Sequence, residues 1–241
     1  MFQTFISEPL YNALVFITGM LPGNNIGLSI IILTILIKVL LIPLQNRALT
    51  TQREIKKIEP ELKRIKKECA GNKELEARKV MGLYREHNVN PFAGFAVILI
   101  QIPIFIGLFL VFREGLESVR FTLYPFVQVP SHVNPIFFGV DLGMRSIVFA
   151  VGIAITQFIQ TYISIPPLSP RENNSSFADD FSRSLSFQMK YIMPIVLGVV
   201  SAGLPAAVSV YWLTSTVFSI IYELWYRRLH PSGGLQVSQA K

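Results

Sequence analysis

The chain has 241 residues, of which 51% are hydrophobic and 15% are charged, and its formal net charge is +7. Long apolar runs in such a composition indicate a single integral membrane domain and argue against a soluble fold. The single cysteine, Cys69, excludes an intrachain disulfide. The three histidines lack metal-ligand spacing, and no signature of a zinc protease, a nucleotide-binding loop or a serine hydrolase is present. We therefore expect no metal, no cofactor and no catalytic nucleophile.

The first segment, residues 1–22, combines an apolar and a polar side at helical spacing. It lacks the basic start of a cleaved signal peptide. The pattern predicts an amphipathic helix that lies in the membrane interface, and the alternative is a loosely held terminus. The apolar side consists of Phe2, Phe5, Ile6, Leu10, Leu14 and Ile17, and the polar side of Gln3, Ser7, Glu8, Tyr11 and Asn12.

The run at 27–45 predicts the first membrane span, because nineteen helical residues cover roughly 28 Å of a hydrocarbon core about 30 Å thick. Its thirteen Leu, Ile and Val residues supply about −4 to −8 kcal/mol of insertion energy. The one lysine in the run, Lys38, opposes insertion by only about 2.5 to 3.5 kcal/mol. Lys38 is therefore expected to enter the membrane, where its charge needs polar or hydrated surroundings.

Residues 46–90 carry twelve Lys or Arg in a polar helical pattern, which predicts a segment outside the membrane. Two narrow apolar stripes, separated by a turn at 70–72, indicate an antiparallel helical hairpin whose first arm is bent at Pro60. The hairpin is interpreted as a docking surface, with a solvated spacer as the alternative.

Four further apolar runs give an expected total of five transmembrane helices in an all-α integral membrane protein. Only three Lys or Arg lie in the loop 113–145, against twelve in the hairpin. The positive-inside rule therefore places the hairpin and the C-terminus in the cytoplasm and the N-terminus outside. The expected order after the hairpin is a second span at 91–112, an extracytoplasmic loop at 113–145, a third span at 146–164, a cytoplasmic loop at 165–187, spans at 188–204 and 206–226, and a cytoplasmic tail at 227–241.

Polar residues fall on single faces of three spans, which suggests that they converge on one hydrated cavity. The alternative is that the hydroxyls and amides join helices to one another and that Lys38 extends toward the interface. The candidate groove residues are Lys38, Thr34, Gln157, Gln160, Trp212, Ser209 and Thr216, and Gln45, Ser164, Ser219 and Glu223 share the same faces.

Five segments of the chain follow one another in the order and spacing of a known family: TILIKVLLIPL, EIKKIEPELKRIKKE, GLYREHNVNPFAGFAVILIQIPIFIGLF, FFGVDLG and MKYIMPIVLGVVSAGLPAAVSVYWLTSTVFSIIYEL. By these segments the chain resembles the YidC family of membrane protein insertases from about Gly27 to Tyr226. The resemblance implies an amphiphilic groove that is open to cytoplasm and lipid and that receives polar parts of a nascent chain. By position, the groove's basic residue is Lys38, where bacterial members usually have arginine, and Ala207 stands where the family often has glycine. The resemblance also implies that Gln157 or Gln160 and Trp212 occupy other polar positions of the groove.

The expected function is that of an insertase and chaperone in the bacterial plasma (inner) membrane, without enzymatic activity. Its expected partners are nascent membrane proteins and the lipid bilayer, with the ribosome, the signal recognition pathway and the Sec translocon as further candidates and no specific nucleic acid. One rival is a small secondary transporter or channel in which Lys38 binds an anion, although the chain shows no internal repeat. A second rival is an assembly scaffold that does not need the charge of Lys38.

Overall fold

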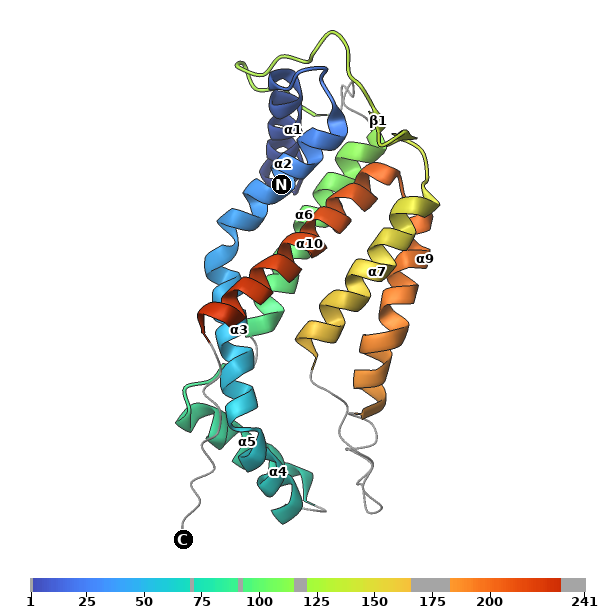
Figure 1. Cartoon of the computed structure of the whole chain (residues 1–241). Coiled ribbons are helices and arrows are strands. Elements are labelled where there is room, and N and C mark those ends of the chain that lie inside the picture. Colours follow the sequence, from blue (N-terminus) through green and yellow to red (C-terminus); the bar gives the residue numbers. More distant parts are fainter. Residues whose placement is uncertain (1, 70–71, 91–92, 115–120, 166–182, 231–241) are drawn as a thin grey trace. The chain divides into compact units, whose positions relative to one another are not determined.

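The computed structural model describes residues 2–69, 72–90, 93–114, 121–165 and 183–230, and these are mostly helical (Figure 1). The chain divides into two compact units. The first consists of residues 1–39 and 104–224, and the second of residues 40–103 and 225–241. The predicted cytoplasmic loop 165–187 falls largely outside the described residues, but its last five residues, 183–187, are helical and belong to the following span.

The first unit begins with a π-helical turn and is mostly helical. Between α6 (Ala93–Glu114) and α7 (Ile147–Ser164) its chain forms one small hairpin of two strands. The two strands pair antiparallel, with Ile136 opposite Asp141, and were not anticipated within the predicted loop 113–145. The elements are η1 (Gln3–Ser7), α1 (Glu8–Met20), α2 (Ile26–Leu40), α6 (Ala93–Glu114), β1 (Ile136–Phe137), β2 (Val140–Asp141), α7 (Ile147–Ser164), η2 (Gln188–Ile192), α9 (Met193–Ala202) and α10 (Ala206–Leu229), with α6 and α10 continuing into the second unit.

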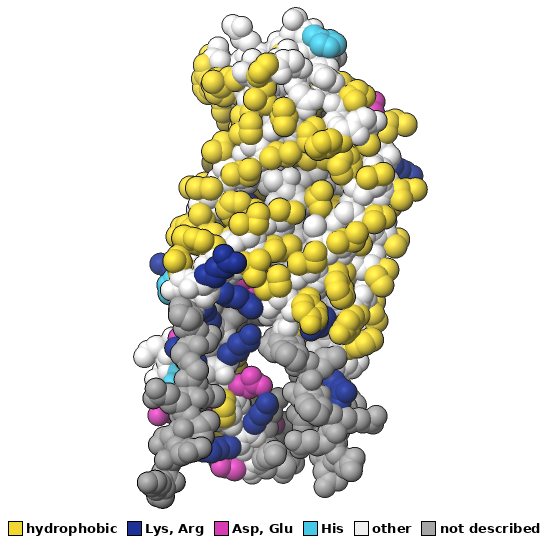
Figure 2. All heavy atoms as spheres, in the orientation of Figure 1, with side chains coloured by type: hydrophobic (Ala, Val, Ile, Leu, Met, Phe, Trp, Pro, Cys, Tyr) yellow, Lys and Arg dark blue, Asp and Glu magenta, His cyan; other side chains and the backbone are white. Residues whose placement is uncertain are grey.

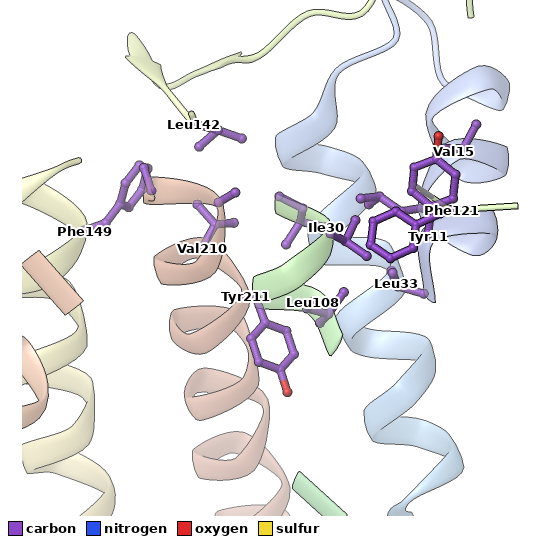
Figure 3. Close-up of a cluster of buried hydrophobic side chains, with 14 of the residues drawn as sticks. Tyr11, Val15, Ile30, Leu33, Leu108, Phe121, Leu142, Phe149, Val210 and Tyr211 are labelled. Carbon is purple, nitrogen blue, oxygen red and sulfur yellow. The ribbon is translucent and has the colours of Figure 1, made fainter. Parts of the chain in front are cut away.

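A buried apolar cluster joins α1, α2, α6 and α10 in the first unit (Figure 3). The rings of Tyr11 and Phe121 lie 5.0 Å apart between centroids, and Leu14 and Val15 are completely buried beside them. Close packing of these side chains supplies van der Waals contacts that favour a fixed arrangement of these helices. Outside this core, Figure 2 shows hydrophobic side chains over most of the visible face of the unit, as expected of a surface in contact with lipid.

Helix α1 is buried with residues from both of the sides that its sequence distinguishes. Ser7, Tyr11 and Asn12 of the polar side are buried, and so is Leu14 of the apolar side, whereas Phe5 is exposed. Long-range hydrogen bonds account for the burial of Asn12. The Asn12 amide nitrogen donates to the carbonyl of Thr122 at 2.9 Å, and its oxygen accepts from the backbone N–H of Tyr124 at 2.8 Å. An interfacial position for residues 1–22 stays a prediction.

The predicted first span, 27–45, does not form one continuous helix. Helix α2 starts at Ile26, where the Asn25 side chain accepts a hydrogen bond from the N–H of Leu28 at 3.1 Å, and it ends at Leu40. Proline lacks an N–H and its ring clashes with the carbonyl four residues earlier, so Pro43 interrupts a helix near this position. The next helix, α3 (Ile42–Lys57), carries this proline near its start, where proline is tolerated.

Among the described residues, three helices are long and apolar enough to cross a membrane: α7, the continuous helix from Arg183 to Ala202, and α10. A fourth is counted if α2 and α3 form one broken span. Residues 91 and 92 of the predicted second span lie outside the described residues, and the remainder lies within α6. The total of five spans stays a prediction.

Helices α7 and α9 lie side by side (Figure 1), because small residues meet at their contact. A Cβ added at Gly198 would lie 2.9 Å from Cβ of Ala154 and 3.3 Å from the carbonyl oxygen of Ala150. The close approach therefore depends on a glycine at this point. After α9, residues 203–205 turn directly into α10, whose first N–H groups at Ala206 and Ala207 donate to the carbonyls of Met144 and Leu142 at 2.7 and 2.9 Å.

The second unit contains α3, α4 (Glu59–Glu68) and α5 (Lys73–Glu86). The first arm of the predicted hairpin is interrupted at Ile58, so that Pro60 takes the second position of α4. Helices α4 and α5 contact each other, and Lys79 forms an ion pair of 3.1 Å with Glu68. The hydrogen bond to Glu68 raises the pKa of Lys79, with a smaller contribution from Cys69. A complete hairpin in the cytoplasm stays a prediction, since residues 70–71 of its turn lie outside the described residues.

Candidate membrane-embedded polar site

Lys38 lies on the last turn of α2 and is only 7% exposed. Its Nζ donates a hydrogen bond of 3.3 Å to Oγ of Ser219 on α10. The Ser219 hydroxyl in turn donates to the carbonyl of Ser215 at 2.9 Å. The ammonium group is thus held by a hydroxyl that is itself oriented by the backbone of α10, which reduces the cost of burying the charge.

A second polar contact joins α7 to α10 one helical turn further along. Oγ of Ser164 donates a hydrogen bond of 2.6 Å to Oε2 of Glu223, whose side chain is 5% exposed. Ser219 and Glu223 are four residues apart and therefore lie on one face of α10, about 6 Å apart along its axis. We refer to these five residues as the Lys38 cluster: Lys38, Ser164, Ser215, Ser219 and Glu223.

The Lys38 cluster combines one cation, one carboxyl group and three hydroxyls contributed by α2, α7 and α10. Such a set can exchange hydrogen bonds with a peptide segment and can attract charges of either sign. It lacks the arrangement that catalysis by a metal requires, because no group of three or more His, Cys, Asp or Glu that could hold an ion occurs among the described residues.

Two of the predicted groove residues are buried on the helices that carry Lys38 and Ser219. Thr34 lies one helical turn before Lys38 in α2, where its hydroxyl donates to the carbonyl of Ile30 at 2.6 Å, and Thr216 lies in α10. Ser209 is buried about 15 Å along α10 from Ser219, where its hydroxyl lies 3.5 Å from that of Ser201.

The remaining three predicted residues are half-buried. Trp212 makes an edge-on ring contact with Phe105 at 5.4 Å between centroids, whereas Gln157 and Gln160 lie on α7 before Ser164. The groove role of these residues stays a prediction.

The sequence analysis overlooked a second buried lysine. Lys190, in η2, is 6% exposed, and its Nζ lies 4.3 Å from the centroid of the Tyr162 ring. The signal was available, because Lys190 is the third residue of the predicted span 188–204. It was missed because a lysine at the end of a span is usually explained by its extension toward water.

Comparison with known proteins agrees with this membrane architecture. The family model described as "60Kd inner membrane protein" matches residues 16–232. A relative from Fusobacterium nucleatum, named "Membrane protein insertase YidC", is 33% identical over 203 residues, which cover 83% of this chain and 85% of the relative. The chain belongs to the YidC family of membrane protein insertases. The family relatives are named as insertases and not as enzymes, which confirms the prediction that the chain is not an enzyme.

Two further YidC relatives are much longer than this chain. The insertase of Syntrophobacter fumaroxidans is 29% identical over 229 residues, and that of Rickettsia bellii is 27% identical over 233 residues. Each match covers 93% of this chain but only 38% and 39% of the relative, respectively. This chain therefore spans less than half the length of these two relatives.

Proposed function

We propose that this YidC-family chain is an insertase and chaperone that receives hydrophilic segments of nascent membrane proteins in a polar groove centred on Lys38. The apolar helices of the substrate are then released into lipid. The observation that carries the proposal is the hydrogen bond from the buried Lys38 ammonium to Ser219, which holds a cation among the membrane helices.

Such a protein has to lower the free energy of transfer into the membrane only for the polar part of the substrate. Transfer of an apolar helix into lipid is favourable by itself, whereas a charged residue near the centre of the membrane costs about 2.5 to 3.5 kcal/mol. Hydroxyls at Ser164, Ser215 and Ser219 can replace part of the hydration of a substrate segment, and Lys38 can attract an acidic one. Two opposite charges 4 Å apart gain about 4 kcal/mol at an effective dielectric constant near 20, before desolvation is subtracted.

In the proposed orientation the N-terminus is outside and residues 46–90 and the C-terminus are cytoplasmic. The concentration of twelve Lys and Arg in residues 46–90 supports this orientation. The exposed charged side chains of α3, α4 and α5, such as Lys57, Lys63 and Arg78, offer a surface for the ribosome, the signal recognition pathway or the Sec translocon.

Reconstitution of the purified chain into liposomes tests the proposal. We expect a small membrane protein synthesised in the presence of these liposomes to become protected from protease in its translocated segment. Liposomes that contain a heat-denatured sample of the chain serve as the control. Equal protection in both would contradict the proposal, and uptake of a small anion without any insertion would instead favour a transporter or channel.

A further inference from the structure

Two basic side chains near the start of the helix Arg183–Ala202 lack a carboxylate partner in the described part of the chain. Lys190 is buried, and the contact found for its ammonium group is the face of the Tyr162 ring. Nη1 of Arg183 is buried and finds no hydrogen-bond acceptor among the described residues. Neither Lys190 nor Arg183 takes part in an ion pair within the described part of the chain. Buried cations are costly unless they are paired, so both side chains favour an anionic ligand.

Lys190 follows Arg183 by seven residues and lies in the π-helical turn η2 (Gln188–Ile192) of the same helix. Seven helical residues correspond to about 10 Å along the axis. Both side chains are long, so that their charged ends can approach one anion that lies between them. Arginine presents a planar fork of N–H donors that matches phosphate oxygens, and lysine adds a compact positive charge.

A group of aromatic rings adjoins Lys190 through Tyr162 and indicates the depth of this lysine in the membrane. The Phe158 ring lies 6.2 Å from Tyr162 and 6.0 Å from Tyr191 between centroids, and Phe187 lies 5.0 Å from Tyr191. Tyr162 is 61% exposed although it covers the ammonium of Lys190. Exposed aromatic rings at the ends of membrane helices are typical of the headgroup level.

The neighbouring surface is apolar. Met189, Ile192 and Ile195 are exposed on η2 and α9, and Ile155 and Ile159 are exposed on α7. A ligand at Arg183 and Lys190 would therefore contact charged groups with its anionic part and exposed hydrocarbon with the remainder. This combination favours a phospholipid over a soluble anion.

We propose that Arg183 and Lys190, framed by the rings of Phe158, Tyr162 and Tyr191, bind the phosphate group of an anionic phospholipid. The site shares no residue with the Lys38 cluster, because its cations come from the helix Arg183–Ala202 and its ring contact comes from Tyr162 of α7. It does not depend on the proposed insertase function, since lipid binding can be measured without a substrate protein.

The test uses the purified full chain in a nonionic detergent, with bound lipid counted by native mass spectrometry. Dioleoyl phosphatidylglycerol is the probe, and dioleoyl phosphatidylcholine and inorganic phosphate are the comparators. We expect phosphatidylglycerol to bind at least about tenfold more tightly than phosphatidylcholine, and Arg183→Gln with Lys190→Gln to remove this preference. The control, Lys63→Gln with Arg78→Gln, changes the net charge equally and should keep the preference.

A second variant separates charge from folding. Arg183→Lys with Lys190→Arg exchanges the two cations and should bind phosphatidylglycerol within about threefold of the unaltered chain. Loss of binding in this exchange variant would overturn the proposal, as would equal binding by the neutral pair and its control. Tighter binding of inorganic phosphate than of phosphatidylglycerol would also overturn the proposal, because the site would then select a small soluble anion.

Discussion

Nζ of Lys38 on α2 donates its hydrogen bond to Oγ of Ser219 on α10, a residue 181 positions later in the chain. This contact joins α2 to α10 at a charged side chain. It also explains how a lysine is accommodated in an apolar run, because the hydroxyl of Ser219 is oriented by the carbonyl of Ser215. The charge is therefore held at a defined place instead of extending freely toward water.

The contact between Ser164 and Glu223 should contribute measurably to stability. A hydrogen bond to a charged group is worth about 1.5 to 3 kcal/mol, and the bond from Oγ to Oε2 is short at 2.6 Å. We expect a double-mutant cycle of Ser164→Ala and Glu223→Gln to give a coupling energy of about 1 kcal/mol or more in the free energy of unfolding in detergent. A coupling energy indistinguishable from zero would show that the two side chains do not stabilise the α7 to α10 contact.

Asn12 should stabilise the first unit, although it lies close to the N-terminus of the chain. Asn12→Ala removes the partner of the Thr122 carbonyl and of the Tyr124 N–H, and we expect a loss of about 2 kcal/mol in the free energy of unfolding. Thr4→Ala, at an exposed position in η1, is the control and should change stability by less than about 0.5 kcal/mol. The account of α1 is wrong if the two variants are equally stable.

The contact between α7 and α9 gives a matched pair of glycine substitutions. Gly198→Ala places a methyl group 2.9 Å from Cβ of Ala154 and should lower the free energy of unfolding by about 1 to 3 kcal/mol. Gly152→Ala meets only Leu213 at an ordinary 3.5 Å and should be neutral or stabilise by up to about 1 kcal/mol, because alanine favours a helix. Thermal unfolding of both variants in detergent measures the difference, and the reverse order of stability would contradict the observed packing.

The orientation can be measured by labelling single cysteines with a membrane-impermeant reagent. The native Cys69 is buried and should first be replaced by serine, so that it cannot react. In intact cells we expect a cysteine at the exposed position Ser131 to be labelled and one at the exposed position Arg78 to react only after the membrane is permeabilised. Labelling of position 78 in intact cells would reverse the proposed orientation.

The sequence predicted those features of the fold that depend on the transfer of an apolar run or of a single charge into the membrane. The long apolar runs at 146–164, 188–204 and 206–226 correspond to helices that satisfy the criteria for a membrane span. Lys38 was identifiable because a charge in an apolar run is costly. The break after α2 was not predicted, because a proline does not always end a helix: Pro43 lies at such a break, whereas Pro103 lies inside the continuous helix α6.

Features that depend on distant partners could not be read from local patterns. The burial of Asn12 in α1 depends on Thr122 and Tyr124, which lie more than 100 residues later. The periodicity of α1 alone does not predict that polar residues are buried beside Leu14. In the same way, the sequence placed Ser209, Thr216 and Ser219 on one face of α10, but only the structure distinguishes Ser219, which contacts Lys38, from Ser209, which contacts Ser201.

The measurement that tests the proposed function most directly is insertion by Lys38 variants in reconstituted liposomes. Two substrates should be compared that differ only in whether their translocated segment is acidic or neutral. Stability of each variant is measured on the same samples, since removing Lys38 also removes an insertion cost of about 2.5 to 3.5 kcal/mol.

Lys38→Arg keeps the charge and should insert both substrates at nearly the rate of the unaltered chain. Lys38→Leu should slow the acidic substrate by about tenfold, which corresponds to a third of the 4 kcal/mol attraction between close charges, and the neutral substrate much less. Lys38→Glu should be slower still with the acidic substrate because of repulsion. Equal insertion of the acidic substrate by a stable Lys38→Leu variant and by the unaltered chain would contradict the role of Lys38 at the centre of the groove.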